Sequence, residues 1–99
     1  MNILDQITFS TDKANVLHLK KSDAIKYFAV ALGKGAILKK HTAPVPSTLL
    51  VLKGEINFVI DGQITTLKQF DVFEIPVNVE HEVVGLSDEN LFTVTQELN

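Results

Sequence analysis

Residues 56–67, INFVIDGQITTL, carry the strongest local fold signal in this sequence of 99 residues. Ile56, Phe58 and Ile60 alternate with their neighbours, which places them on one face of an extended strand. The Asp61-Gly62 pair that follows suits a tight two-residue turn, and a second run of β-forming residues comes directly after it. The stretch therefore predicts a β-hairpin.

Similar runs continue on both sides of this hairpin, separated by turn-forming residues. They are NVLHL (15–19), IKYFAVAL (25–32), TLLVL (48–52), DVFEI (71–75), EHEVVGL (80–86) and LFTVTQEL (91–98). No long segment has the 3.6-residue period of an amphipathic helix. About eight to ten short strands with very little helix predict an all-β sandwich or small barrel.

Length and composition restrict the class of protein further. A chain of 99 residues with 45% apolar residues predicts one folded domain, residues 1–99, with a core barrel over about residues 25–97. No apolar run approaches the ~20 residues that span a membrane, and the first residues do not resemble a secretory signal. The absence of cysteine fits a cytoplasmic protein. A net charge of −3 without any arginine argues against nucleic-acid binding.

Two histidines lie in settings that point to a known family. His41 follows Gly35 by six residues, and His81 ends the stretch FDVFEIPVNVEH (70–81). This order of strands and turns resembles a small single-domain cupin. That family's first motif reads G-x5-H-x-H-x3,4-E-x6-G, and its second reads G-x5-P-x-G-x2-H-x3-N. The resemblance covers residues 30–97 and implies a cupin-like β-barrel, the double-stranded β-helix or jelly roll.

The match keeps the frame of both motifs but few of their polar side chains. In the first motif Gly35, His41 and Gly54 fall on family positions, whereas Ala43 stands at the second histidine and Ser47 at the glutamate. In the second motif Pro76 and His81 match, Phe70 and Asn78 stand at the two glycines, and Gly85 replaces the asparagine. Phe70 stands where the family has a glycine, which can adopt a positive φ without steric cost. Because a side chain makes positive φ costly, the backbone of this turn tests the resemblance.

The resemblance implies a place for one divalent metal ion, bound in metal-bearing cupins by three histidines and one glutamate. Only His41 and His81 remain here as ligands, whereas a catalytic site normally has about three protein ligands. Glu80 and Glu82 flank His81 and should point to the opposite face, as should Thr42 relative to its neighbours. His18 lies opposite the Leu17 and Leu19 face, which predicts a surface position, and nothing in the sequence brings Gln63, Gln69 or Gln96 inward.

The function expected on these grounds is small-molecule binding or sensing, with no cofactor required and a divalent metal still possible. If the strand register follows that of the family, alternate residues of the two motif strands point inward and line a pocket. These residues are His41, Ala43, Ser47, Leu49, Val51, His81 and Val83. The alternative is a small metal-dependent cupin enzyme, of the dioxygenase, isomerase or lyase type, that uses His41 and His81. A metal-free acid or base role for either histidine also remains open.

A homodimer is expected because strands such as residues 25–32 are apolar on both faces, so a second sheet or a partner chain has to cover them. In cupin-like proteins the N-terminal strand often crosses to a partner. Residues 1–20 are the segment that would do so in this chain.

Overall fold

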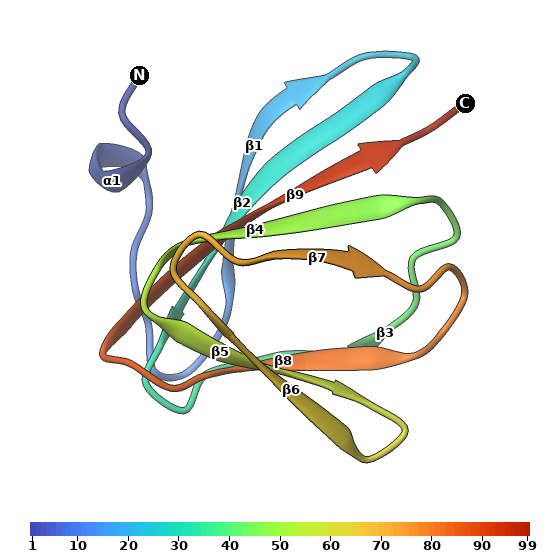
Figure 1. The fold of residues 1–99 in the computed structure, drawn as a ribbon. Coiled ribbons are helices and arrows are strands. Elements are labelled where there is room, and N and C mark those ends of the chain that lie inside the picture. The colour runs from blue at the N-terminus through green and yellow to red at the C-terminus, as the bar shows by residue number, and fades with distance from the viewer.

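The computed structural model describes all 99 residues, and nearly all of its regular structure is β (Figure 1). A single short helix, α1 (Ile3–Gln6), precedes the strands. The strands are β1 (Asn15–Lys21), β2 (Ile25–Gly33), β3 (Ile37–His41), β4 (Ser47–Lys53), β5 (Glu55–Ile60), β6 (Gln63–Lys68), β7 (Val72–Ile75), β8 (His81–Gly85) and β9 (Glu89–Glu97). The predicted all-β class with little helix is confirmed.

The strands form two antiparallel sheets that face one another as two layers (Figure 1). The five-stranded sheet has the order β1-β2-β9-β4-β7, and the four-stranded sheet has the order β3-β8-β5-β6. Every connection except those of the β1–β2 and β5–β6 hairpins passes from one sheet to the other. This alternation is the jelly-roll topology that the family resemblance implies.

The predicted β5–β6 hairpin is present with the expected register. Ile60 pairs with Gln63, so Asp61 and Gly62 are its two turn residues, and their φ angles are +50° and +76°. Positive φ at both central positions defines a type I′ turn, which matches the right-handed twist of the strands.

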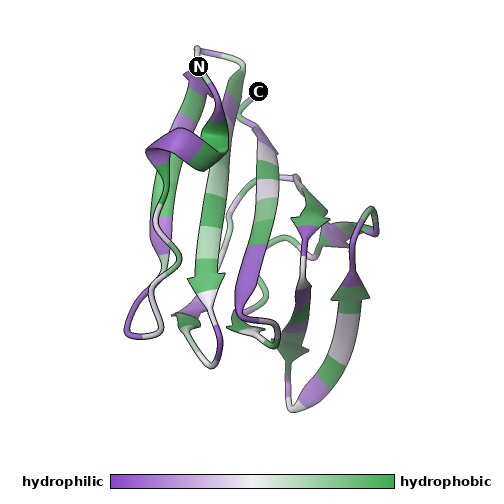
Figure 2. Cartoon of the chain, turned by 90° about the vertical axis from the view of Figure 1, so that its left-hand side faces the viewer, coloured by the Kyte–Doolittle hydropathy of each residue, from purple (hydrophilic) through white to green (hydrophobic).

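The core lies between the two sheets, and alternation along the strands decides what enters it. Hydrophobic and hydrophilic residues alternate along most strands (Figure 2). The inward residues come from both layers and include Val30, Leu49, Ile56, Phe58 and Phe92, each at most 1% exposed. Burial of side chains of this size contributes about 1.5–3 kcal/mol each relative to exposure.

The outer face of β2 is covered by the chain itself. Ala29 and Ala31 are fully buried there, packed against Ile7, Phe9 and Leu17 of the N-terminal region. The expectation that a second sheet or a partner chain covers this face is corrected, because the N-terminal region of the same chain covers it; the dimer itself stays a prediction. The same packing corrects the assignment of faces on β1. Leu17 points outward with Ala29, whereas His18 pairs with Phe28 on the inner face and remains exposed.

The turn before β7 keeps the left-handed backbone that the family's glycine allows. Phe70 has a φ of +72°, and Asn78, at the second glycine position, has a φ of +62°. The backbone N–H of Phe70 donates to the carbonyl of Val51, and the carboxylate of Asp71 accepts from the backbone N–H of Lys68. Because the Phe70 ring is 71% exposed, no packing contact opposes this conformation. The strain at Phe70 therefore comes from its backbone conformation.

Asn90 fixes one end of the sandwich. Its side chain is fully buried and makes four hydrogen bonds. Oδ1 accepts from the backbone N–H groups of Glu55 and Ser87, and Nδ2 donates to the carbonyls of Leu32 and Ser87. These partners belong to both sheets and to the β8–β9 connection, so one amide holds three segments together.

In this structure no helix has both the length and the apolar character needed to cross a membrane.

Candidate functional site

The candidate site lies at the opposite end of the sandwich, where the β3–β4 and β7–β8 connections meet. His41 ends β3, His81 begins β8, and the two residues are cross-strand partners. Below them the backbone N–H of Asn78 donates to the carbonyl of Ala43 at 2.9 Å, which joins the two connections. The frame that the motif spacing predicts therefore brings the two histidines together.

His81 is held from two sides. Its ring is stacked on Phe58, with 5.0 Å between the ring centroids, and its Nδ1 lies 3.0 Å from the carbonyl oxygen of Val79. Because a carbonyl can only accept, Nδ1 carries a proton and donates it. The residue is 3% exposed, and this burial lowers the pKa of His81 below its ordinary value of 6.5. The bond to Val79 opposes that shift, and the nearby His41 adds to it.

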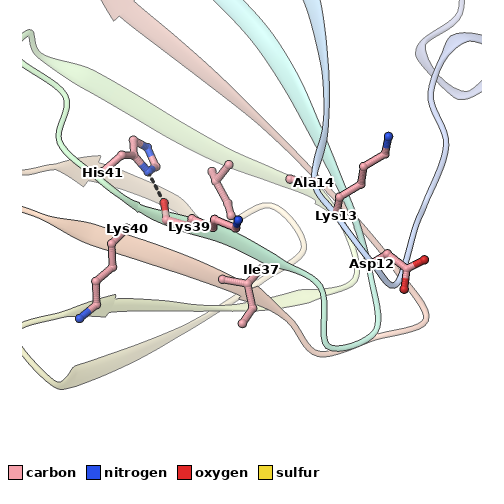
Figure 3. A pocket seen from close by; sticks show the side chains of 8 residues that line it. Asp12, Lys13, Ala14, Ile37, Lys39, Lys40 and His41 are labelled. Carbon is pink, nitrogen blue, oxygen red and sulfur yellow. Dashed lines mark hydrogen bonds between the residues drawn. The ribbon is translucent and has the colours of Figure 1, made fainter.

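His41 approaches the same point from the surface. Its Nδ1 lies 2.7 Å from the carbonyl oxygen of Lys39, as the dashed line in Figure 3 shows, so this nitrogen is also a donor. The Lys40 side chain points away from the His41 ring (Figure 3). The two Nε2 atoms of His41 and His81 face each other at 3.1 Å. Both imidazoles therefore turn the same ring nitrogen toward a shared position.

A small interior cavity of about 30 Å³ lies beside this pair, and two imidazoles and one amide interrupt its apolar wall. It is lined by Phe28, Leu38, His41, Ala43, Leu49, Phe58, Ile75, His81, Val83, Phe92, Val94 and Gln96. Five of the seven predicted pocket residues are brought together here, namely His41, Ala43, Leu49, His81 and Val83. The volume has room for one water-sized group.

Two predicted pocket residues lie elsewhere. Val51 is fully buried in the core, farther along β4 from the histidines. Ser47 is buried beside the cavity, where its hydroxyl donates to the carbonyl of Val45 and accepts from Gln96 Nε2 at 3.3 Å. Gln96 takes the lining position instead. Alternation along LFTVTQEL carries the signal, because Phe92, Val94 and Gln96 share one face.

A larger groove of about 500 Å³ reaches the surface from the same place. It runs between residues 12–14, which precede β1, and strand β3 (Figure 3). It shares Leu38 and His41 with the interior cavity, and three lysines, Lys13, Lys39 and Lys40, line it against the single acid Asp12. In a chain of net charge −3, this groove is a locally cationic approach to the histidine pair.

The side chains present do not fit a resident metal ion. The orientation suits one, because metal-binding histidines commonly donate their other ring N–H to a carbonyl. However, no group of three or more His, Cys, Asp or Glu side chains is placed to hold an ion. Ala43 has no donor atom, and the Ser47 hydroxyl is already engaged. Without a carboxylate, a dication in this apolar cavity keeps its whole charge uncompensated.

Comparison with known proteins identifies the family. The Cupin domain family model matches residues 28–95, from β2 to β9. This chain belongs to the cupin family. No curated protein matches the sequence of this cupin.

Solved structures share the cupin's fold over its whole length. An RmlC-like cupin protein from Desulfovibrio desulfuricans is 23% identical with a TM-score of 0.87, and the match covers 99% of this chain and 94% of that one. A cupin superfamily protein from Desulfitobacterium hafniense is 17% identical with a TM-score of 0.85, covering 100% and 90%. A conserved protein of unknown function from Streptococcus pyogenes is 13% identical with a TM-score of 0.83, covering 100% and 86%. At such identities the likeness shows the fold, the double-stranded β-helix.

Proposed function

We propose that this cupin domain binds a small molecule at its histidine end. The observation that carries the proposal is the interior cavity, where His41, His81 and Gln96 converge within an otherwise apolar wall. A concave apolar site with a few convergent polar groups is the usual form of a small-molecule site. The apolar wall contributes binding energy, and the three polar groups select the orientation of the ligand.

The interior cavity and the surface groove suit two different parts of one ligand. The interior cavity of about 30 Å³ accommodates one small group, whereas the groove of about 500 Å³ has room for the body of a metabolite. Because His41 and Leu38 line both hollows, a ligand lying in the groove presents its end to the histidine pair. This arrangement supports a ligand with a compact polar end.

Binding is better supported than catalysis. A histidine acting as general base is normally oriented by a third group, often a carboxylate, and needs a nucleophile within hydrogen-bond reach. Here both ring Nδ1 atoms are held by backbone carbonyls, and the hydroxyl of Ser47 is directed to Val45. The set fits recognition of a ligand, as in a sensory or carrier domain.

Nuclear magnetic resonance titration with a library of small metabolites tests the proposal. Ligands that bind should shift the backbone resonances of residues lining the cavity and the groove. Ala43→Leu, which fills the cavity, should weaken binding at least tenfold, because a displaced ligand end loses its contacts with the wall. The matched variant Ala24→Leu changes an exposed alanine and should bind normally. Shifts confined to other surfaces, or equal binding by both variants, would contradict the site.

A homodimer is proposed with it, on a different observation. Phe70 and Val72 are 71% and 63% exposed, and they lie at the outer strand β7, which pairs with β4 alone. An open strand edge with exposed apolar side chains favours pairing with a second chain. Sedimentation velocity should show a dimer at micromolar concentration, and Val72→Lys should shift it to monomer. A monomeric native protein would refute this.

A further inference from the structure

Positive charge lines both walls of the surface groove. Lys39 and Lys40 belong to β3, Lys13 belongs to the segment that precedes β1 on the facing wall, and Asp12 is the only acid of the lining (Figure 3). The one ion pair of this structure lies outside the groove, at Lys53, so none of the three groove lysines is paired with a carboxylate. Three ammonium groups are therefore available to a ligand that enters the groove.

A β-bulge in β3 allows two of these lysines to line the same groove. The pairing of β3 with β8 is interrupted after Leu38 and resumes at His41, so Lys39 and Lys40 together stand opposite the single residue Glu82. Strict alternation would turn these two neighbouring side chains to opposite faces of the sheet. With the extra residue, both line the groove. Bulges next to functional sites commonly re-aim side chains in this way.

A purely structural role accounts for only part of this pattern. Strand β3 is an outer strand, and lysines and bulges on such strands commonly prevent pairing with another chain. That role does not extend to Lys13, which lies outside the strands. It also leaves unexplained why apolar residues, Ala14, Ile37 and Leu38, lie between the charged ones in the same lining. A groove that offers both apolar contacts and unpaired cations is suited to binding.

The two hollows differ in where they accept a negative charge. The interior cavity has an apolar wall with two imidazoles and one amide, and no lysine lines it. A buried anion there would lack a cationic partner, which is costly. In the groove the ammonium groups of Lys13, Lys39 and Lys40 supply that partner. The part of a ligand that lies in the groove is therefore the part that can carry the charge, whereas the end at the histidine pair is uncharged.

Acidic side chains determine which lysines are most available. Lys40 also borders the hollow on the far side of His81, which contains three acids, Asp61, Glu80 and Glu82. A further hollow of about 340 Å³, which shares Lys39 and Lys40 with the groove, contains Glu82 as well. These acids repel an anion from the far side of β3. Lys13 and Lys39 do not border the far hollow, so they are the principal partners of an anion in the groove.

We infer that the ligand of this site is an anionic metabolite, which places its negative charge in the groove against Lys13 and Lys39 and its uncharged polar end at the histidine pair. The inference rests on the proposed function and names its ligand class. The charge comes from a carboxylate or from a phosphate group. Both present oxygen acceptors to ammonium groups, and a lysine acts on either as a point charge without a planar geometry to match.

The test compares anions with neutral molecules of similar shape on the intact protein at pH 7.5. The carboxylate 4-hydroxybenzoate is titrated against 4-hydroxybenzamide, and glycerol 3-phosphate against glycerol, with backbone amide shifts as the readout. Each anion should bind about tenfold more tightly than its neutral counterpart, because exposed ion pairs contribute modestly and several act together. The pair of compounds with the larger difference identifies the source of the charge.

Ionic strength gives a second readout of the same contacts. Binding of the anions should weaken severalfold between about 0.01 M and 1 M salt, because salt screens exposed charges. Binding of the neutral compounds should stay unchanged over this range. The shifts of the anions should include residues 12–14 and 37–40, which line the groove.

Variants separate the groove lysines from the net charge of the protein. Lys13→Gln with Lys39→Gln should weaken binding of 4-hydroxybenzoate about fivefold and leave binding of 4-hydroxybenzamide unchanged. The matched control, Lys20→Gln with Lys21→Gln, removes the same charge from β1 outside every hollow and should bind as the native protein does. All four side chains are exposed, so both variants should fold.

Failure of the inference is distinguishable from failure of the proposed function. Equal binding of anions and neutral counterparts, or equal losses in the two double variants, would refute the charged groove and leave a small-molecule site intact. Binding in the metabolite library by neutral compounds alone would refute the ligand class. No binding by any library compound would remove the proposed function and this inference together.

Discussion

Each end of the sandwich has a buried polar side chain, Asn90 at one end and His81 at the other, but the two ends satisfy it differently. At one end Asn90 offers two donors and two acceptor sites, and four backbone groups meet them. At the other end His41 and His81 face three contacts with two protons. All four polar positions of the asparagine amide have partners, whereas the neutral histidine pair has one proton fewer than its three contacts need.

The difference separates a structural from a functional polar group. A fully satisfied neutral amide holds its neighbours in one arrangement at every pH at which the protein folds. The protonation of imidazole groups changes with pH, and their hydrogen bonds change with it. The two ends should therefore respond in opposite ways to mutation and to solution conditions.

The largest effect is expected at the asparagine end. Asn90→Ala leaves two N–H groups and two carbonyls without partners at a buried position, so it should lower the free energy of unfolding by about 3 kcal/mol or more. Denaturant titration measures this. Asn57→Ala removes a single exposed bond to Thr66 and should cost about 0.5 kcal/mol. Similar losses in both variants would remove the contrast between the ends.

The next effect concerns the missing metal ligands. The native protein should carry well under one equivalent of transition metal, because two imidazoles leave most of the coordination sphere to water. Ala43→His with Ser47→Glu restores the family's donors and should tighten binding of Ni²⁺, Zn²⁺ and Mn²⁺ by more than the ~100-fold typical of indirect ligand contacts. Elemental analysis and calorimetry measure both proteins. The control Thr42→His with Thr48→Glu places the same two groups at the positions adjacent to Ala43 and Ser47. An equal gain in metal affinity in this control would show that the alignment with the first cupin motif is wrong.

A smaller effect is the pH dependence of stability at the histidine end. Because folding lowers the pKa of His81, the unfolded chain binds a proton more readily than the native one. The stabilisation is complete above pH 6.5 and is lost as the pH falls through the lower pKa of the folded state. Urea titrations across this range should show this loss. His81→Gln should remove the dependence, and an unchanged slope would assign it to another group.

The smallest effect is expected at the turn before β7. Phe70→Gly should raise the free energy of unfolding by about 1 kcal/mol, because glycine adopts a φ of +72° without the penalty of a side chain. Gly35→Ala is the reverse change. The φ of Gly35 is +78°, and no atom lies within 4 Å of the position that an added methyl group would occupy. Only the backbone penalty therefore applies, and stability should fall by a similar amount. Thermal unfolding compares the two, and shifts of the same sign would contradict the explanation.

Sequence alone was sufficient where a pattern has one physical reading. The alternation of Ile56, Phe58 and Ile60 around Asp61-Gly62 predicted the hairpin with its register. The resemblance of the segments around His41 and His81 to the two cupin motifs implied that their strands would meet, and they do. In contrast, β3 was not among the predicted runs, because its residues ILKKH are mostly exposed and have no apolar face.

The remaining features depend on contacts between distant segments. The apolar face of β1 was ambiguous because the N-terminal segment creates a second apolar layer outside the sheet. Asn90 lies in a turn-like sequence, SDEN, and only the fold shows that Gly54 and Gly85 leave room beside its amide. Local alternation places Gln96 on one face with Phe92 and Val94, but only the position of β9 between β2 and β4 shows that this face lines the cavity.

The position of β9 also determines when the protein can assemble during synthesis. This strand, residues 89–97, is the last in the chain, yet it lies at the centre of the five-stranded sheet and pairs with both β2 and β4. The emerging chain consequently exposes the edges of β2 and β4 until the final strand has left the ribosome. Closure of that sheet is a late and long-range event, which favours slow folding relative to a helical protein of equal length. A ribosome-stalled chain that ends before residue 89 should therefore remain accessible to chaperones and proteases.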